Sequence, residues 1–204
     1  MHISHLRHRY TDEDYIDAAT FRVKFKDYFH LKNLYIMMHQ WLIENMYATL
    51  DMENFPETFY LQRETQQAGR EIWFWWRMEK NLVDSSYYKY VMDVDVKVIL
   101  LRDVEVIHQG KKFKTNWGQP EIKIWARLVK DADHKWRNHW FLKNINENFH
   151  KRIFKNELDM HKVEFYREAY RFQEAIKTYL KLKTYLPEPE LQKWTPVRGL
   201  GETV

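Results

Sequence analysis

Residues 87–108 read YYKYVMDVDVKVILLRDVEVIH and residues 111–129 read KKFKTNWGQPEIKIWARLV, and these two stretches decide the fold. In the first stretch, apolar residues occupy the even positions and charged residues many of the odd ones. A period of two is typical of a β-strand with one buried face. The second stretch repeats the pattern from Ile122 to Leu128. The sequence therefore predicts two long antiparallel strands that share one apolar face.

The loop between these strands determines how they pair. With a three-residue loop at 109–111, Val96 lies opposite Ile124 and both side chains face inward. A two-residue loop would place Lys123 opposite Val96, because a slip of one residue turns every side chain to the other face. We therefore predict the three-residue loop, in which Gly110 supplies the backbone freedom.

The two predicted strands are too long to remain straight. Residues 87–108 would span about 73 Å at ~3.3 Å per residue, whereas a compact domain of this size is about 43 Å across. Gly118 and Pro120 are residues expected at a bulge or kink, and they fall opposite residues 101–103. The sheet should therefore be strongly curved. On its convex side we expect Asp93 to oppose Arg127 as an exposed ion pair of small value.

Upstream of these strands, the sequence predicts a mixture of helix and strand. Thr11 resembles the cap of a short helix that continues to Ala19, and the alternation that follows, from Phe21 to Phe25, predicts a first strand. Residues 31–49 have apolar residues at helical spacing and predict an amphipathic helix. Within this helix, the five-residue spacing of His39 and Glu44 puts them on different faces, so we interpret them as surface polar groups rather than an acid-base pair.

Two further strands are predicted at 58–65 and 70–80, joined across a polar turn that contains Gly69. In the second strand, Phe74 and Trp76 share the buried face, while Trp73 and Trp75 lie on the opposite face. Two tryptophans on a solvent-facing surface are unusual, so we expect them to be covered. The cover could be this chain's own helix or tail, a second copy of the protein, or a ligand.

After Asp131 the pattern changes to a helical period. Residues 134–155 have helical character, and residues 157–186 carry a continuous apolar stripe at spacings of three and four. Pro187 and Pro189 end this helix, and residues 187–204 read as an extended tail. We therefore predict an α+β fold, a curved antiparallel sheet wrapped around a long C-terminal helix. The expected organisation is an N-terminal arm and short helix at 1–19, a single domain at 20–186 and the tail at 187–204.

This order of elements resembles the helix-grip or START-like (SRPBCC) superfamily, in which a curved antiparallel sheet wraps a long C-terminal helix. The resemblance covers residues 20–186 and lies in the apolar stripes of Val94, Val96 and Val98 and of Phe165, Phe172 and Ile176. Only one helix rather than a pair follows the first strand, which departs from the usual pattern. The resemblance implies binding of a lipid, a sterol or another apolar molecule.

The composition limits the classes of function. The chain has 204 residues, is 45% hydrophobic and 30% charged, and contains no stretch of about 20 apolar residues that could span a membrane. The absence of cysteine excludes disulfides, thiolate chemistry and cysteine-ligated zinc. We expect a cytoplasmic protein without a cofactor. His2, His5 and His8 share a helical spacing, but we interpret them as a solvated basic arm rather than a metal site.

The first functional hypothesis is a non-enzymatic module that binds an apolar molecule or lipid between the sheet and the C-terminal helix. The alternative for the same side chains is that they fill the core. The predicted lining residues are Phe74, Trp76, Met92, Val94, Val96, Phe165, Phe172 and Ile176.

The second hypothesis is an interaction subunit that docks on nucleic acid, on an anionic membrane surface or on a protein assembly through basic C-terminal helices. Residues 134–185 contain twelve Lys or Arg against six Asp or Glu. Cations interleaved with aromatic rings suit phosphate contacts and stacking. The alternative is a solvated helix face paired with Glu164, Glu168 and Glu174. The predicted contact residues are Lys135, Arg137, Lys151, Arg152, Lys155, Lys162, Arg167 and Arg171.

A third hypothesis, an enzyme, would need an acid-base pair. His108, His134 or His139 with a carboxylate could form one, but no spacing in the sequence supports such a pair.

Overall fold

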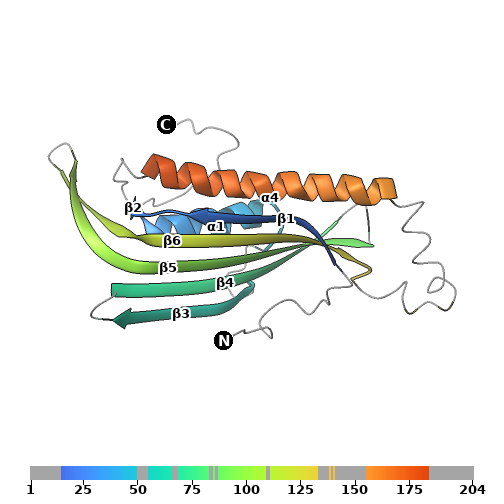
Figure 1. Cartoon of the computed structure of the whole chain (residues 1–204), viewed down its shortest axis with the longest axis horizontal. Coiled ribbons are helices and arrows are strands. Elements are labelled where there is room, and N and C mark those ends of the chain that lie inside the picture. The colour runs from blue at the N-terminus through green and yellow to red at the C-terminus, as the bar shows by residue number, and fades with distance from the viewer. Residues whose placement is uncertain are drawn as a thin grey trace.

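The computed structural model describes residues 15–49, 55–65, 69–82, 85, 87–108, 111–132, 138, 140 and 155–183. Within these ranges, six strands form one open antiparallel sheet, and a C-terminal helix packs against it (Figure 1). This architecture confirms the predicted α+β fold. In chain order the elements are β1 (Tyr15–Lys24), β2 (Asp27–Phe29), α1 (Leu31–Glu44), β3 (Glu57–Thr65), β4 (Gly69–Asn81), β5 (Tyr88–His108), β6 (Lys111–Lys130) and α4 (Lys155–Lys183).

The strand order is β1-β6-β5-β4-β3, with the short β2 also paired to β6. The first strand therefore joins the sheet beside the last one, about 100 residues later in sequence. This position corrects the prediction of a short helix through Ala19, because Tyr15 to Ala19 belong to β1 and pair with β6. A local capping pattern is a weak signal that pairing with a long neighbouring strand overrides.

The predicted register of β5 and β6 is wrong by two residues. Val96 lies opposite Ile122, not Ile124, and the pairing of His108 with Lys111 leaves a two-residue connection rather than three. A bulge restores the apolar face that the shorter connection would have turned outward. Between Ile99 and Arg102, two residues of β5 oppose Gly118 alone.

Backbone geometry at the bulge explains its position. Leu100 takes a left-handed conformation with a φ of 57°, which a residue with a side chain rarely adopts. A Cβ added to Gly118 would lie 3.3 Å from the Leu101 Cα and 3.4 Å from the Ile99 carbonyl oxygen. The sequence analysis placed the bend at this point correctly. Gly69, with a φ of 72°, likewise occupies the turn before β4 as expected.

Helices α1 and α4 lie on one face of the sheet, and the core fills the space between them and the strands. In α1, the His30 side chain caps the N-terminus by accepting a hydrogen bond from the Asn33 amide at 3.3 Å. The Tyr35 ring packs against Phe74 and Trp76, with centroid distances of 5.2 and 5.1 Å. His39 is buried rather than on the surface as predicted, because its ring packs 4.1 Å from Phe55.

Helix α4 buries the predicted stripe from Phe165 to Leu180. The Phe165 ring stacks on Tyr90 of β5 at 4.4 Å, and Phe172 packs 4.7 Å from Trp41 of α1. The α4 helix thus joins the sheet to α1 through aromatic contacts. The predicted tail at 187–204 and nearly all of the predicted helix at 134–155 lie outside the described residues.

Candidate functional site

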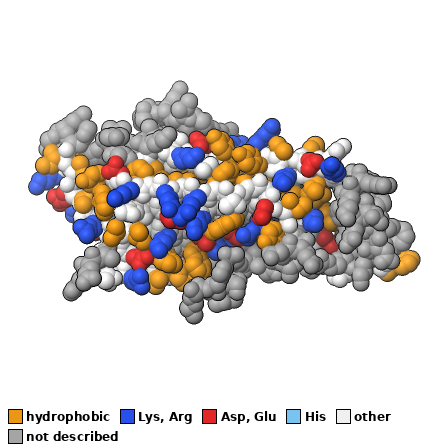
Figure 2. Space-filling model, in the orientation of Figure 1, with side chains coloured by type: hydrophobic (Ala, Val, Ile, Leu, Met, Phe, Trp, Pro, Cys, Tyr) orange, Lys and Arg blue, Asp and Glu red, His pale blue; other side chains and the backbone are white. Residues whose placement is uncertain are grey.

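The most distinctive surface is the face of the sheet opposite α1 and α4, which we call the outer face. The strand pairing sets its side chains in rows that cross the sheet. Figure 2 looks onto this face, where Lys and Arg side chains gather over the middle of the sheet. One row consists of Arg22, Lys123, Asp95, Trp75 and Phe59. The next row consists of Lys24, Glu121, Lys97, Trp73 and Leu61.

The β3 and β4 ends of these rows carry aromatic rings. Trp75 stacks on Phe59 with a centroid distance of 4.4 Å and an interplanar angle of 30°. The Trp73 indole N–H donates a 2.7 Å hydrogen bond to Glu71, and the Lys97 ammonium lies 4.4 Å from the Trp73 ring. Both indoles are half-buried, so part of each ring remains accessible. Fixed and partly exposed rings of this kind are suited to stacking on a planar ligand.

The β1 and β6 ends of the rows carry cations grouped around one carboxylate. Glu121 lies 2.7 Å from Arg22, 3.5 Å from Lys123 and 3.7 Å from Lys24. Burial alone would raise the pKa of Glu121, but the hydrogen bond from Arg22 and the three positive charges hold that pKa below its ordinary value. Glu121 is therefore ionised at neutral pH and neutralises only one of the three cations.

A second carboxylate, Glu71, has the same arrangement on β4. It accepts hydrogen bonds from Arg63 at 2.7 Å and from Trp73, and Lys97 lies 3.8 Å away. Burial would raise the pKa of Glu71, but these donors and charges together lower it. Glu71 thus orients a tryptophan and two cations at once.

Around Glu121 and Glu71 the cations are more exposed than the acids that hold them. Elsewhere on the outer face the order is reversed, since Arg77 is 7% exposed against 26% for Asp95. The side chains of Arg22 and Lys24 are 53% and 60% exposed, against 24% for Glu121. Arg63 is 65% exposed, against 17% for Glu71. At these two clusters an approaching ligand therefore meets the positive charges first, which favours anions there.

Next to the first row, on the same face, lies a network of ion pairs that differs from the prediction. Asp93 does pair with Arg127, at 2.6 Å, but it opposes Trp125 in the register and its side chain is 3% exposed. Arg77 lies 3.8 Å from Asp93 and 2.6 Å from Asp95. The pair expected to be exposed and of small value is thus a buried network that fixes β4, β5 and β6 in place.

The covers proposed for Trp73 and Trp75 are only partly resolved. Residues 15–19 of the N-terminal helix proposed as a cover belong to strand β1. Helix α1 packs on Phe74 and Trp76, on the other face, so it does not cover the two tryptophans either. The tail that formed the other intramolecular candidate lies outside the described residues. The prediction that this face belongs to an assembly surface stays a prediction.

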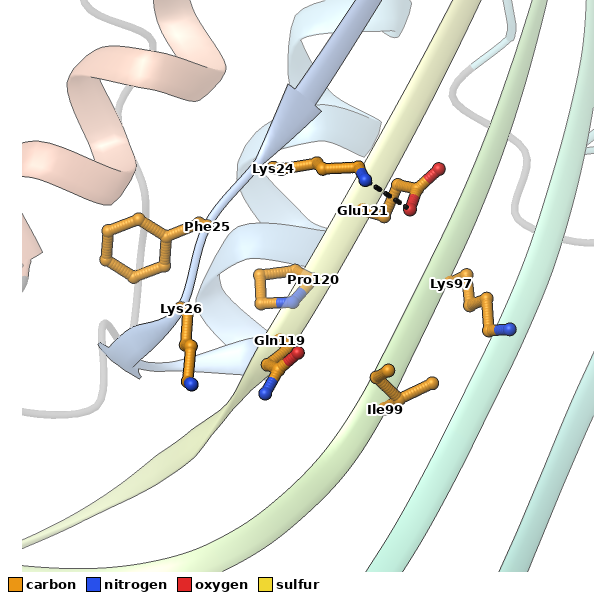
Figure 3. Close-up of a pocket in the computed structure, with 8 residues that line it drawn as sticks. All are labelled: Lys24, Phe25, Lys26, Lys97, Ile99, Gln119, Pro120 and Glu121. Atoms are coloured by element: carbon orange, nitrogen blue, oxygen red, sulfur yellow. Dashed lines mark ion pairs between the residues drawn. The ribbon is translucent and has the colours of Figure 1, made fainter.

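A shallow pocket lies at the β1 and β2 end of the outer face, where the sheet bends (Figure 3). Its volume is about 360 Å³. Three lysines and one carboxylate line it, so its wall has two more positive than negative charges. The lining residues are Lys24, Phe25, Lys26, Lys97, Ile99, Gln119, Pro120 and Glu121.

The residues predicted to enclose an apolar ligand are all in the core. Each is at most 2% exposed, and several pack ring against ring, such as Phe74 against Trp76 at 5.1 Å. Side chains that are this inaccessible contact one another rather than an open space. The eight residues are Phe74, Trp76, Met92, Val94, Val96, Phe165, Phe172 and Ile176.

Half of the predicted anion-binding residues can be placed. Lys155, Arg167 and Arg171 are exposed on α4, and Lys162 is half-buried there. Nearby, Glu168 pairs with Lys80 of β4 at 2.6 Å and Glu174 pairs with Lys177 at 3.0 Å. The four cations themselves have no ion pair within the described part of the chain. Lys135, Arg137, Lys151 and Arg152 lie outside the described residues.

A polar cluster that the sequence did not predict lies between the sheet and α4. Lys80 and Glu168 form its ion pair, and the Tyr90 hydroxyl lies 3.3 Å from both His161 Nδ1 and Glu164. Burial, followed by the nearby carboxylates, raises the pKa of Tyr90 well above its ordinary value. Tyr90 therefore stays protonated at neutral pH, and the cluster is suited to holding α4 on the sheet. Its residues come from separate elements, so no local motif signals it.

The comparisons with known proteins identify no relative, since neither protein-family models nor curated proteins match this chain. The resemblance to the helix-grip superfamily therefore stays a prediction. In the described ranges, no helix is both long and apolar enough to cross a membrane. The same ranges contain no group of three or more His, Cys, Asp or Glu side chains that could hold a metal ion. The histidines of the enzyme hypothesis have no described side chains.

Proposed function

We propose that this protein is a non-enzymatic binding module that holds single-stranded nucleic acid on the outer face of its sheet. The observation that carries the proposal is the presence of accessible aromatic rings and outward-projecting cations in the same two rows. Sheets that bind single strands combine these two features, because bases stack on the rings and cations contact the phosphates.

The spacing of the rows suits a nucleotide chain. Neighbouring strands are ~4.8 Å apart, so a ring on β4 is about 5 Å from a cation on β5 and about 10 Å from one on β6. Trp73 thus lies opposite Lys97, while Trp75 lies opposite Asp95, with Lys123 one strand further on. A base on Trp73 would place its phosphate over Lys97.

Unpaired bases fit this surface better than a duplex. The indoles contact neighbours within the sheet, through the Phe59 stack and the hydrogen bond to Glu71, and present an accessible surface outward. In a duplex the base faces are already stacked on one another, so no base face is available to stack on these rings. Stacking on exposed rings takes place on a surface and does not require a deep cleft.

The test is a fluorescence-anisotropy titration of a labelled single-stranded 20-mer of mixed sequence. We expect the wild type to bind, and the double variant Lys97→Gln/Lys123→Gln to bind at least about tenfold more weakly. The matched control is Arg167→Gln/Arg171→Gln, which removes the same charge from α4 and should leave the affinity within about twofold. Absence of binding by the wild type would refute the proposal. If the wild type binds a duplex as tightly as the single strand, the surface is a general anion-binding surface instead. The same conclusion follows if Trp73→Ala/Trp75→Ala binds heparin as tightly as the wild type does.

A second candidate is docking through α4, which is favoured by Arg167 and Arg171, two cations that have no ion pair with any described residue. Exposed apolar side chains lie on the same helix, including Tyr166 and Tyr170, whose rings stack against each other and pack on Phe21 of β1. A basic helix with exposed rings is suited to an anionic surface. If the α4 variant rather than the sheet variant loses binding in the same titration, this candidate replaces the first.

Binding of an apolar molecule inside the domain also stays a prediction. A ligand there would have to displace core side chains such as Phe74 and Phe172. Native mass spectrometry of the purified protein tests this idea, because a bound lipid would appear as a mass that organic extraction removes.

A further inference from the structure

We infer that the pocket beside Lys26 is a subsite for a phosphate monoester, and that on the proposed nucleic-acid surface it receives the phosphorylated end of a strand. This inference rests on the proposed function and shares Lys97 with the stacking surface, but it adds Lys26, which that surface does not require. The pocket is built from three separate chain segments: the end of β1 and the residues after it, the middle of β5, and β6 at the bend.

The charges of the pocket match a dianion. Lys24, Lys26 and Lys97 line it, and Glu121 is the single carboxylate in its wall. Glu121 is held by Arg22 at 2.7 Å, outside the pocket lining, and also lies 3.7 Å from Lys24. Lys97 lies 3.8 Å from Glu71, so these two lysines share their charge with carboxylates. Lys26 is exposed and has no carboxylate partner in the described part of the chain. A phosphate monoester has about −1.5 to −2 charge at neutral pH, whereas an internal phosphodiester has only one negative charge.

The remaining wall residues suit the sugar and base beyond the phosphate. Gln119 supplies an amide that can donate and accept hydrogen bonds. In Figure 3 the side chains of Lys26 and Gln119 point in the same direction, with Lys97 and Ile99 on the opposite side of the pocket. A volume of about 360 Å³ is at the lower end for small-molecule sites, which suits a nucleotide end rather than a long ligand.

A backbone hydrogen bond holds two walls of the pocket together. The Phe25 amide donates a 3.1 Å hydrogen bond to the Pro120 carbonyl, which fixes the segment after β1 against β6. Pro120 and Gly118 are buried at the bend. The lysines therefore project from a rigid frame, and binding should require little rearrangement.

Lys97 connects the pocket to the stacking surface. Its ammonium lies 4.4 Å from the Trp73 ring, and the same side chain lines the pocket. A strand stacked on Trp75 and Trp73 would therefore reach the pocket with its next phosphate. Because the phosphorylated end of the strand would bind in the pocket, the strand would bind with one fixed polarity.

The test compares single-stranded oligonucleotides that differ only at their ends: 5′-phosphate, 3′-phosphate or hydroxyl at both. For the wild type we expect one of the two phosphates to strengthen binding about tenfold. Lys26→Gln should abolish that increment while leaving the affinity for the hydroxyl-ended strand nearly unchanged. The control Arg63→Gln, on the opposite edge of the sheet, should weaken all three strands equally and keep the increment.

A second measurement separates failure of this inference from failure of the proposed function. Acetylation of Lys26 by a lysine-selective reagent is followed by mass spectrometry in the presence of adenosine or adenosine monophosphate. We expect the monophosphate to protect Lys26 and adenosine not to. Protection without any binding of oligonucleotides would identify a free mononucleotide as the ligand and refute the strand surface alone. Strand binding with no phosphate increment and no protection would refute the subsite alone, and protection by inorganic phosphate at equal concentration would reduce it to a simple anion site.

Discussion

The two faces of the sheet use the same residue types for different purposes. On the inner face, Phe74 and Trp76 are buried under α1 and pack with Tyr35, while on the outer face Trp73 and Trp75 keep part of their rings accessible. The inner face contains few charges. The outer face carries rings beside cations, and around Glu121 and Glu71 these cations are more exposed than their acidic partners. Apolar packing thus dominates the inner face, whereas rings and charged groups share the outer face.

The strongest way to test this comparison is to remove neighbouring rings of β4 that point in opposite directions. Phe74→Ala on the inner face should lower the free energy of unfolding by about 3–5 kcal/mol, because it leaves a cavity in a closely packed core. Its affinity for a single strand should remain that of the wild type under conditions where the variant is folded. Urea titration combined with anisotropy measures both quantities. A loss below about 1 kcal/mol would show that this face is not the core.

Removal of the buried ion pairs of the outer face should also have a large effect on stability. Asp93→Ala removes a carboxylate that pairs with Arg127 at 2.6 Å and with Arg77 at 3.8 Å. Breaking a buried pair leaves uncompensated charge, so the free energy of unfolding should fall by about 3 kcal/mol or more. The exposed pair of Lys177 with Glu174 on α4 is the control. Glu174→Ala should change the free energy of unfolding by less than about 1 kcal/mol. Equal small effects would mean that Asp93 is solvated after all.

Trp75→Ala should separate stability from binding. Because the ring is half-buried, its removal should cost about 1–2 kcal/mol of stability, less than the neighbouring inner-face change. Its loss should weaken single-strand binding about tenfold, the value of one base stacked on an aromatic ring. Size-exclusion chromatography with light scattering tests the remaining alternative. A wild-type dimer that becomes a folded monomer on this substitution would make the outer face an intersubunit contact.

The smallest expected effect is the pH dependence of the outer-face carboxylates. Since the pKa of Glu121 and that of Glu71 are held below their ordinary values in the folded protein, their pairs stabilise it fully above about pH 5. This contribution is lost as the pH falls through the lowered pKa values. The free energy of unfolding should therefore fall less between pH 5 and pH 3 in Glu121→Gln than in the wild type, as measured by urea titration. The same substitution should strengthen nucleic-acid binding at pH 7, because it removes a negative charge from the basic group.

The local sequence correctly predicted which side chains form the inner face, but it did not predict the register between β5 and β6. Alternation from Tyr88 to Leu100 identifies a strand and its buried side chains. It cannot distinguish a three-residue loop from a two-residue loop combined with a bulge, because both leave the same residues facing inward. The left-handed conformation of Leu100 has no local sequence signal, since glycine is the residue expected there.

The outer face was predictable in part. Alternation shows that Trp73, Trp75 and Lys97 point away from the core, and the sequence analysis identified the two tryptophans as unusual. The cations around Glu121 were not predictable, because Arg22 and Glu121 meet only through pairing of β1 with β6, 99 residues apart. The helix predicted at 11–19 concealed this pairing. The basic group thus depends on a long-range contact that no local pattern encodes.

The most direct test of the account is the salt dependence of single-strand binding. The logarithm of the association constant falls linearly with the logarithm of salt concentration, by a slope of about 0.7 for each phosphate contact on a single strand. We predict that Lys97→Gln/Lys123→Gln reduces this slope by about 1.4 and that Arg167→Gln/Arg171→Gln leaves it unchanged. A slope that falls in the α4 variant and not in the sheet variant would contradict the assignment of binding to the outer face.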